Sequence, residues 1–395
     1  MPISTPLFDM LHELLDEAKK AGASATDAVA AVSTSLSATL RNGALSDLER
    51  SEGKEISLRV LVGKRQASLA TSDVDHKTFR ELAERAVATA RLAPEDPYAG
   101  LPEIEECALL IADLDLLDTH APNAEDLIEK ARVMEEAARE NPAIAQVEES
   151  AASASQSSAA YLASNGFAGS ARSSMHSLYV TPIAGESTNM VRDYDQALAH
   201  HAADLRTPQE VGQLAASRTA LRRNARKMPS ARVPVVFSSR NAGSLLRTLL
   251  SAINGQAVAR RTSFLMESLG QDIFSPAVTV IDDPSMARGL RSRSFDGEGL
   301  PCEKRALVEK GKLNHFLLNL SAARQLKMKS TGHAGREAGG PPGISASNVY
   351  IENGAVSPEA LITDIKSGFL VTDTMGFGVN TLTGDFSQGA LGFWI

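Results

Sequence analysis

Cysteine is nearly absent from this chain, and long apolar runs are missing altogether. Cys107 and Cys302 are the only cysteines among 395 residues. Two cysteines exclude a disulfide framework and any zinc site built from cysteine alone. No apolar stretch approaches the ~18 residues of a membrane span. The N-terminus lacks a basic region followed by an apolar one, so we expect a cytoplasmic protein with reduced thiols.

Positive charge is outweighed by negative charge. The chain has 40 Lys and Arg against 48 Asp and Glu, which gives a formal charge of −8. This mild acidity argues against non-specific binding to nucleic acid or to an anionic membrane surface. The balance of apolar and charged residues is typical of a globular protein, and at about 150 residues per domain the length predicts two or three domains.

The histidines do not stand in a spacing that holds a metal. His12-Glu13 is not followed by a second histidine one helical turn later, as a zinc-peptidase helix requires. His200 and His201 are adjacent, so they would point to different sides of a helix or strand. The nucleophile elbow G-x-S-x-G and the phosphate-binding loop G-x-x-x-x-G-K-[ST] are also absent. We therefore interpret each lone histidine as a surface or hydrogen-bonded residue.

Residues 1–95 predict an α+β unit in which antiparallel strands lie between two helices. Apolar residues at helical spacing indicate helices over 7–20 and 76–91. Asn42-Gly43 and Gly63-Lys64 fit tight hairpin turns. Alternating patterns indicate strands over 27–32, 35–41, 56–62 and 65–71.

Residues 96–228 predict a linker followed by a second α+β segment. The proline-containing stretch 93–121 is typical of a linker, with one short apolar piece at 108–112. A helix is expected over 124–139. The serine-rich stretch 146–195 alternates as solvated antiparallel strands do, so we expect strands there and not a flexible linker.

A helix start is marked by Thr207-Pro208-Gln209-Glu210. Threonine at the cap, proline at the first helical position and glutamate three residues after the cap form a capping box. We expect this helix to reach about Lys227. The arginines and the lysine near its end are interpreted as cations favoured by the helix dipole, and not as a nucleic-acid patch, because no aromatic residues interleave for base stacking.

Residues 229–395 predict a β-rich C-terminal domain with few helices. A helix with an apolar face is expected over 241–253. Short strands between glycine turns are expected over 277–281, 305–309, 313–320, 348–352, 369–372 and 389–394. The fold class is therefore α+β, with a mixed N-terminal region of helices and antiparallel strands followed by a β-rich C-terminal domain.

The glycine-rich run 331–343 is the most unusual segment. It is either a backbone cradle for a ligand or extended peptide, with His333 and Arg336 supplying polar contacts, or a long mobile loop. Asp282-Asp283 and the carboxylates of Asp296 and Glu298 lack calcium-loop spacing. We interpret them as parts of turns and solvated loops.

Six strings stand in order along the chain: R-N-G-A-L-S-D-L-E-R-S-E (41–52), L-R-V-L-V-G-K-R-Q-A (58–67), A-S-N-G-F (163–167), F-D-G-E-G-L-P (295–301), K-S-T-G-H-A-G (329–335) and G-V-N-T-L-T-G-D-F-S-Q-G-A-L-G-F-W-I (378–395). Together they resemble the TldD/PmbA family, and the resemblance covers essentially the whole chain.

The resemblance implies a cytosolic protease of two homologous subunits. The TldD-like subunit carries zinc on an H-E-x-x-x-H helix, and the PmbA/TldE subunit lacks this motif. The corresponding helix here is 241–253, where Leu246, Arg247 and Ser251 stand in place of the first histidine, the glutamate and the second histidine. Leucine and arginine offer no neutral or anionic donor atom to zinc. The chain thus resembles PmbA/TldE, with no cofactor of its own and zinc expected in the partner.

The resemblance also bears on the end of the chain and on candidate site residues. Family members are expected to continue past G-F-W-I with further strands, so we expect a C-terminal domain truncated at Ile395. The candidates for a substrate cleft or a subunit interface are Thr331, Gly332, His333, Arg336, Asn348, Gly384 and Asp385.

We expect a non-catalytic subunit that docks a TldD-like metallopeptidase subunit, or a second copy of this chain. It would help to hold an extended or unfolded peptide during proteolysis and peptide maturation. Neither nucleic acid nor membrane is expected as a partner. The alternative is a protein-binding regulator of DNA gyrase or of a toxin–antitoxin protein, as the family's older name, modulator of DNA gyrase, suggests. A metal-free hydrolase acting alone has no nucleophile–base pair to support it.

Overall fold

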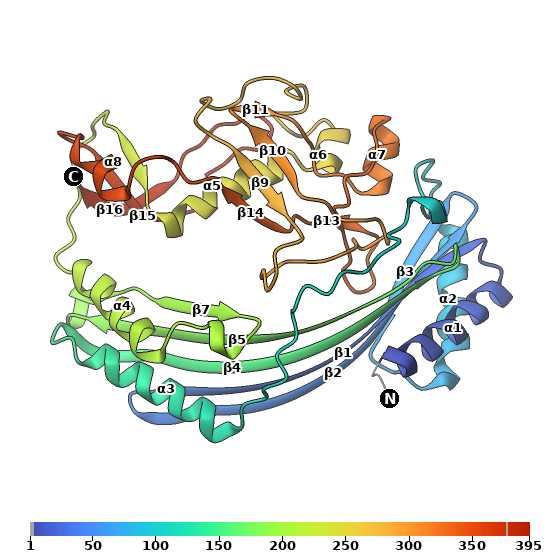
Figure 1. Ribbon diagram of the computed structural model, residues 1–395, viewed down its shortest axis with the longest axis horizontal. Helices are drawn as coiled ribbons and strands as arrows, with labels where there is room; N and C mark the ends of the chain where they lie inside the picture. Colours follow the sequence, from blue (N-terminus) through green and yellow to red (C-terminus); the bar gives the residue numbers. More distant parts are fainter. Residues whose placement is uncertain (1–3, 377) are drawn as a thin grey trace.

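One long, curved antiparallel sheet dominates the computed structural model, which describes residues 4–376 and 378–395 (Figure 1). The strand order is β3-β2-β1-β4-β5-β6, and β7 also pairs with β5. The strands are β1 (Ala25–Arg41), β2 (Ala44–Val62), β3 (Arg65–Thr71), β4 (Ile144–Ala163), β5 (Ala168–Ala184), β6 (Val191–Arg192) and β7 (Asp195–Ala199). The predicted segments 1–95 and 96–228 therefore share one sheet, joined where β1 pairs with β4.

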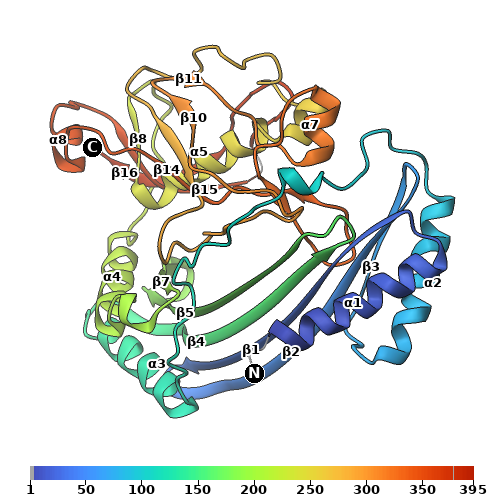
Figure 2. The same cartoon turned by 45° about the vertical axis from the view of Figure 1, so that its right-hand side comes forward.

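Four helices cover the outer, convex face of this sheet (Figure 2). They are α1 (Ser4–Ala21), α2 (His76–Leu92), α3 (Ala124–Arg139) and α4 (Pro208–Leu221). One apolar core lies under α1 and α2, where Leu58 and Phe79 are fully buried. A second core lies under α3 and α4 around Met134 and Leu178. The amphipathic helices and the alternating strands are thus explained by the same two cores.

The C-terminal body lies over the concave face of the sheet (Figure 1). Its helices are α5 (Ser239–Ala252), α6 (Gly255–Ala259), α7 (Leu320–Leu326) and α8 (Pro358–Thr363). Its strands are β8 (Val235–Phe237), β9 (Val280–Asp283), β10 (Arg305–Glu309), β11 (Lys312–Leu313), β12 (Ala334–Gly335), β13 (Gly343–Ile344), β14 (Asn348–Ile351), β15 (Phe369–Met375) and β16 (Gly389–Trp394). They form three small sheets, and β8 pairs with β15 in parallel. The α+β fold class is confirmed.

The predicted linker runs between the sheet and the C-terminal body, and we call its residues 108–118 the strap. It is tied to both sides by backbone hydrogen bonds. The N–H of Ala108 donates to the carbonyl of Gly299, and the N–H of Arg288 donates to Leu114, both at 2.9 Å. The N–H of Ser174 in β5 donates to Leu116 at 2.9 Å.

Two local predictions are wrong. The expected strand 313–320 is a buried, irregular segment that ends where the Asn319 side chain caps α7. A short apolar run is buried in either case, so its periodicity does not distinguish a strand from another buried segment. The helix from Thr207 begins at the expected capping box but ends at Leu221, and Asn224 just beyond it takes a left-handed conformation.

No helix within residues 4–376 and 378–395 combines the length and the apolar character needed to span a bilayer.

Candidate functional site

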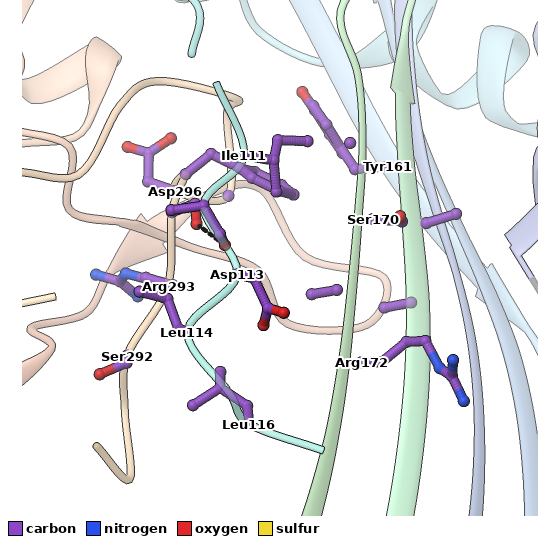
Figure 3. A pocket seen from close by; sticks show the side chains of 18 of the residues that line it. Ile111, Asp113, Leu114, Leu116, Tyr161, Ser170, Arg172, Ser292, Arg293 and Asp296 are labelled. Carbon is purple, nitrogen blue, oxygen red and sulfur yellow. Dashed lines mark hydrogen bonds between the residues drawn. The ribbon is translucent and has the colours of Figure 1, made fainter. Parts of the chain in front are cut away.

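A cavity of about 660 Å³ lies between the concave face of the sheet and the C-terminal body (Figure 3). Its floor comes from residues 159–161 of β4 and 169–172 of β5. The strap forms one wall, and the loop 292–297 with Arg336 forms another. Three segments far apart in the sequence therefore have to meet before this cavity exists.

The floor is small and apolar because side chains alternate along the strands. Ala159 pairs with Ala171, and Tyr161 pairs with Gly169, so these residues share one face of the sheet. Arg172 alternates with Ala171, and its side chain extends away from the strap on the far side of β5 (Figure 3). Its guanidinium group does not enter the cavity.

A buried ionic cluster lies beside the cavity, where the sheet meets the C-terminal body. The Arg59 side chain of β2 donates to the Asp27 carboxylate of β1 through Nε at 2.9 Å, and Arg336 donates to the same carboxylate. The Tyr161 hydroxyl donates to Asp27 at 3.3 Å, and Nη1 of Arg59 lies 3.8 Å from Glu298. We call Asp27, Arg59, Glu298, Arg336 and Tyr161 the interface cluster.

The charges of the interface cluster are set by competition between burial and pairing. Burial raises the pKa of Asp27, but the guanidinium groups of Arg59 and Arg336 outweigh it, so this pKa lies below its usual value. Burial raises the pKa of Glu298 to about 7 despite the nearby Arg59. Burial also raises the pKa of Asp296, two residues away. The site therefore combines a firmly ionised aspartate with a glutamate that titrates near neutrality.

The residues Thr331, Gly332 and His333, predicted from the glycine-rich run, lie in the core of the C-terminal body. The two ring nitrogens of His333 contact Asp282 at 2.6 Å and Thr331 at 2.8 Å, and 2 % of the histidine is exposed. Gly332 has φ +71°, and a Cβ there would meet the Pro301 carbonyl oxygen at 2.4 Å. The start of the run is thus fixed by packing and hydrogen bonds.

The remaining predicted residues are scattered. Arg336 lines the cavity and joins the interface cluster. Asn348 braces the neighbouring loop by donating to Ser292 at 2.7 Å and accepting from the N–H of Arg291. Gly384 turns beside the ring of Phe264 with φ +81°, and the exposed Asp385 accepts from Thr383, so neither lines the cavity. The substrate-cleft or interface role of this set stays a prediction.

Helix α5 carries Leu246, Arg247 and Ser251, which the family resemblance predicts to stand in place of the zinc motif. Leu246 packs against the core of the C-terminal body, and Arg247 and Ser251 are exposed. The Ser251 hydroxyl donates to the backbone carbonyl of Arg247 at 2.9 Å. Within the described residues, no group of three His, Cys, Asp or Glu side chains is arranged to hold a metal. The donor set on α5 does not fit zinc.

Most of the interface cluster is not predicted by the sequence pattern. The interpretation of Asp296 and Glu298 as parts of turns and solvated loops is wrong, because each is 2 % exposed, and the same interpretation is wrong for the buried Asp282 and Asp283. One signal in the sequence points to the cluster: Arg59 stands between the apolar residues Leu58 and Val60 in a predicted strand. A charged residue in such a strand needs a buried counter-ion, but the sequence does not say which residue supplies it.

Comparisons with known proteins point to one family over most of the chain. Models of the PmbA/TldA metallopeptidase domain 1, central domain and C-terminal domain match residues 26–90, 118–223 and 230–395. The chain is 33 % identical to the metalloprotease PmbA of Escherichia coli O157:H7, over 92 % of this chain and 79 % of that protein. It is 31 % identical to a PmbA homologue of Haemophilus influenzae, over 96 % of this chain and 82 % of that protein.

Solved structures show the same fold. A protein of Bacteroides thetaiotaomicron described as a modulator of DNA gyrase superposes with a TM-score of 0.90 at 27 % identity, covering 99 % of this chain and 87 % of that one. TldE from Thermococcus kodakarensis superposes with a TM-score of 0.84 at 22 % identity, covering 98 % of this chain and 90 % of that one. The family that the sequence resembles is therefore confirmed: the chain belongs to the PmbA/TldD family.

Proposed function

We propose that this chain is the non-catalytic, PmbA/TldE-like subunit of a two-component cytoplasmic zinc metallopeptidase. The observation that carries the proposal is the chemistry of α5. By the family resemblance Leu246, Arg247 and Ser251 stand in place of the zinc motif, and neither an aliphatic group nor a guanidinium supplies a donor for zinc. The zinc and the hydrolytic step are assigned to a TldD-like partner.

The role left to this chain is to dock that partner and to hold the peptide. A concave sheet under the C-terminal body offers a sheltered surface, and its floor carries short side chains such as Ser155, Ser157 and Ser173. An extended peptide binds well to such surfaces because its main-chain hydrogen bonds require no particular sequence. A second copy of this chain is the alternative partner.

A reconstitution experiment tests this proposal. The chain is co-expressed with a homologue that carries H-E-x-x-x-H, and cleavage of an unfolded polypeptide is measured for each subunit and for both together. We expect a stable complex and cleavage only with both subunits. A chain that cleaves alone, or one that captures DNA gyrase and ignores the homologue, contradicts the proposal.

A further inference from the structure

One arginine of the 660 Å³ cavity has a donor that the protein leaves without a partner. The Arg336 side chain is 11 % exposed, and its Nη2 donates to the Asp27 carboxylate. Its Nη1 is buried and has no hydrogen-bond partner within the described residues. A guanidinium group has five N–H donors and no acceptor, and a buried donor without a partner is unfavourable. The group that complements Arg336 is therefore an acceptor, and an anion forms the strongest hydrogen bond with it.

The Arg336 guanidinium group lies at the end of the cavity that Tyr161 forms. Its Cζ atom is 5.8 Å from the centre of the Tyr161 ring, and both residues line the cavity. Ile111 extends from the strap towards the same ring (Figure 3). A ligand that enters the cavity as far as Tyr161 therefore brings its leading end next to Arg336.

Positive charge around this end is only partly offset by the protein. The Asp27 carboxylate is shared by Arg59 and Arg336, so one carboxylate faces two guanidinium groups. Burial raises the pKa of Glu298, beside Arg59, to about 7, so this carboxyl group is ionised only in part near neutrality. Arg293 adds a further positive charge behind the wall, where its Nε is buried without a partner and its guanidinium group extends away from the strap (Figure 3). A bound anion complements this charge distribution.

The carboxylates that line the cavity do not supply that anion. Asp296 accepts from three backbone N–H groups at 2.9–3.0 Å. Asp115 pairs with Arg288 at 2.6 Å. Asp113 is exposed, accepts from the N–H of Asp115 at 2.9 Å and points away from Tyr161 in Figure 3. Water screens the charges of the two strap carboxylates, so they oppose an anion at Arg336 only weakly.

The rest of the cavity suits an apolar side chain. Phe295 and Ile111 line its walls, while Ala159 and Ala171 leave the floor empty of large side chains. The volume lies within the range of small-ligand pockets. The cavity thus combines an arginine at one end with apolar space in front of it.

We propose that this cavity receives the carboxyl terminus of an extended peptide whose last side chain is apolar. The terminal carboxylate accepts from the Arg336 guanidinium group at the Tyr161 end, and the last side chain lies over Ala159 and Ala171. The inference rests on the proposed peptide-holding function and deepens it by naming the end of the peptide that is held. No bond is formed or broken in this chain.

Calorimetric titration of the full chain tests the proposal with N-acetyl-leucyl-leucine as the probe. N-acetyl-leucyl-leucinamide keeps both side chains and removes the negative charge. We expect the acid to bind roughly tenfold or more tightly than the amide, which is the range of a charge-assisted hydrogen bond. The third probe, 4-methylpentanoate, has the carboxylate and the apolar tail without a peptide group, and we expect it to bind more weakly than the peptide acid.

Three outcomes of this titration overturn the proposal. Equal binding of the acid and the amide would show that the carboxylate is not recognised. Binding of neither peptide would show that the cavity is no peptide site. Binding of 4-methylpentanoate as tightly as the peptide acid would show that the ligand is a simple organic acid.

Two substitutions locate the site. We expect Arg336→Gln to remove the preference for the acid and to leave the affinity for the amide unchanged. Arg172→Gln is the matched control, because it removes the same charge from a side chain that extends away from the strap on the far side of β5, and it should keep the preference (Figure 3). Ala171→Phe fills the floor and should abolish binding of both peptides. Persistence of the preference in Arg336→Gln would overturn the proposal.

Circular dichroism checks that the variants fold, because Arg336 also pairs with the buried Asp27. If Arg336→Gln unfolds, the comparison of acid and amide on the wild-type chain decides whether a carboxylate is recognised. Ala171→Phe then decides where, and undiminished binding by this folded variant would overturn the proposal.

The outcome is separable from that of the proposed function. A preference for the peptide acid in a chain that forms no complex with the H-E-x-x-x-H homologue would support the carboxyl-terminal site and refute the subunit role. A functional complex in which this chain binds the acid and the amide equally would refute this inference alone.

Discussion

At the scale of single residues, the interface cluster binds the sheet to the C-terminal body. Asp27 is fully buried and accepts from two guanidinium groups, one from each side of this interface. A buried ion pair adds little net stability compared with apolar residues of the same size. Removing one partner is nevertheless costly, because it leaves an uncompensated buried charge.

The first prediction concerns this uncompensated charge. Asp27→Asn keeps the shape of the side chain but removes the charge that offsets Arg59 and Arg336. We expect the free energy of unfolding to fall by about 3 kcal/mol. The control Asp47→Asn lies on the exposed part of β2 and should change stability by less than about 0.5 kcal/mol. Urea unfolding measures both, and equal midpoints for the two variants would contradict a stabilising role for the cluster.

The second prediction is a pH dependence from Glu298, whose pKa burial raises from 4.5 to about 7. The folded state keeps this proton more firmly, so the stabilisation is complete below about pH 4.5 and is lost as the pH rises through 7. Glu298→Gln mimics the protonated acid and can still accept from the N–H of Leu320. We expect the variant to gain on the order of 3 kcal/mol relative to wild type between about pH 5 and pH 8. Parallel stability profiles of the two proteins would refute the assignment.

At the scale of elements, prediction succeeded where the signal is local. Helix α3 lies over the expected residues because Asn123 caps it and one of its faces is apolar. Strand β3 also lies over the expected residues, directly after the tight turn at Gly63-Lys64. The first part of β2, residues 44–55, was missed. Its side chains are exposed on both faces, so no burial imposes an alternating pattern. Tertiary contacts decide such a strand, and single-sequence patterns do not contain them.

The third prediction compares two helical glycines with opposite surroundings. A Cβ on Gly212 of α4 would lie 2.3 Å from the Met134 carbonyl oxygen of α3, whereas one on Gly243 of α5 meets only the end of the Arg247 side chain at 3.9 Å. We expect Gly212→Ala to lower stability by about 1–3 kcal/mol through overpacking. Gly243→Ala should raise stability by roughly 0.5–1 kcal/mol through helix propensity. Thermal unfolding measures both shifts, and shifts of the same sign would contradict the packing described.

At the scale of the whole molecule, the candidate site depends on contacts that no local pattern reveals. Asp27 and Arg336 are 309 residues apart, and the strap meets both β5 and the C-terminal body. Further ion pairs join the same two parts near α4, where Asp193 pairs with Arg240 of α5 and Arg222 pairs with Asp373 of β15. The sequence indicated the family through short motifs, and this assignment is confirmed. The cavity arises only when these distant segments are brought together.

The most direct test of the subunit assignment is a count of zinc atoms by mass spectrometry. Zinc is measured in the purified full chain, in the H-E-x-x-x-H homologue and in their complex, after equal exposure to the metal. Because α5 offers leucine, arginine and serine in place of the motif, we predict one zinc per complex, bound by the homologue, and no stoichiometric zinc in this chain. One tightly bound zinc per molecule of the isolated chain would contradict the account.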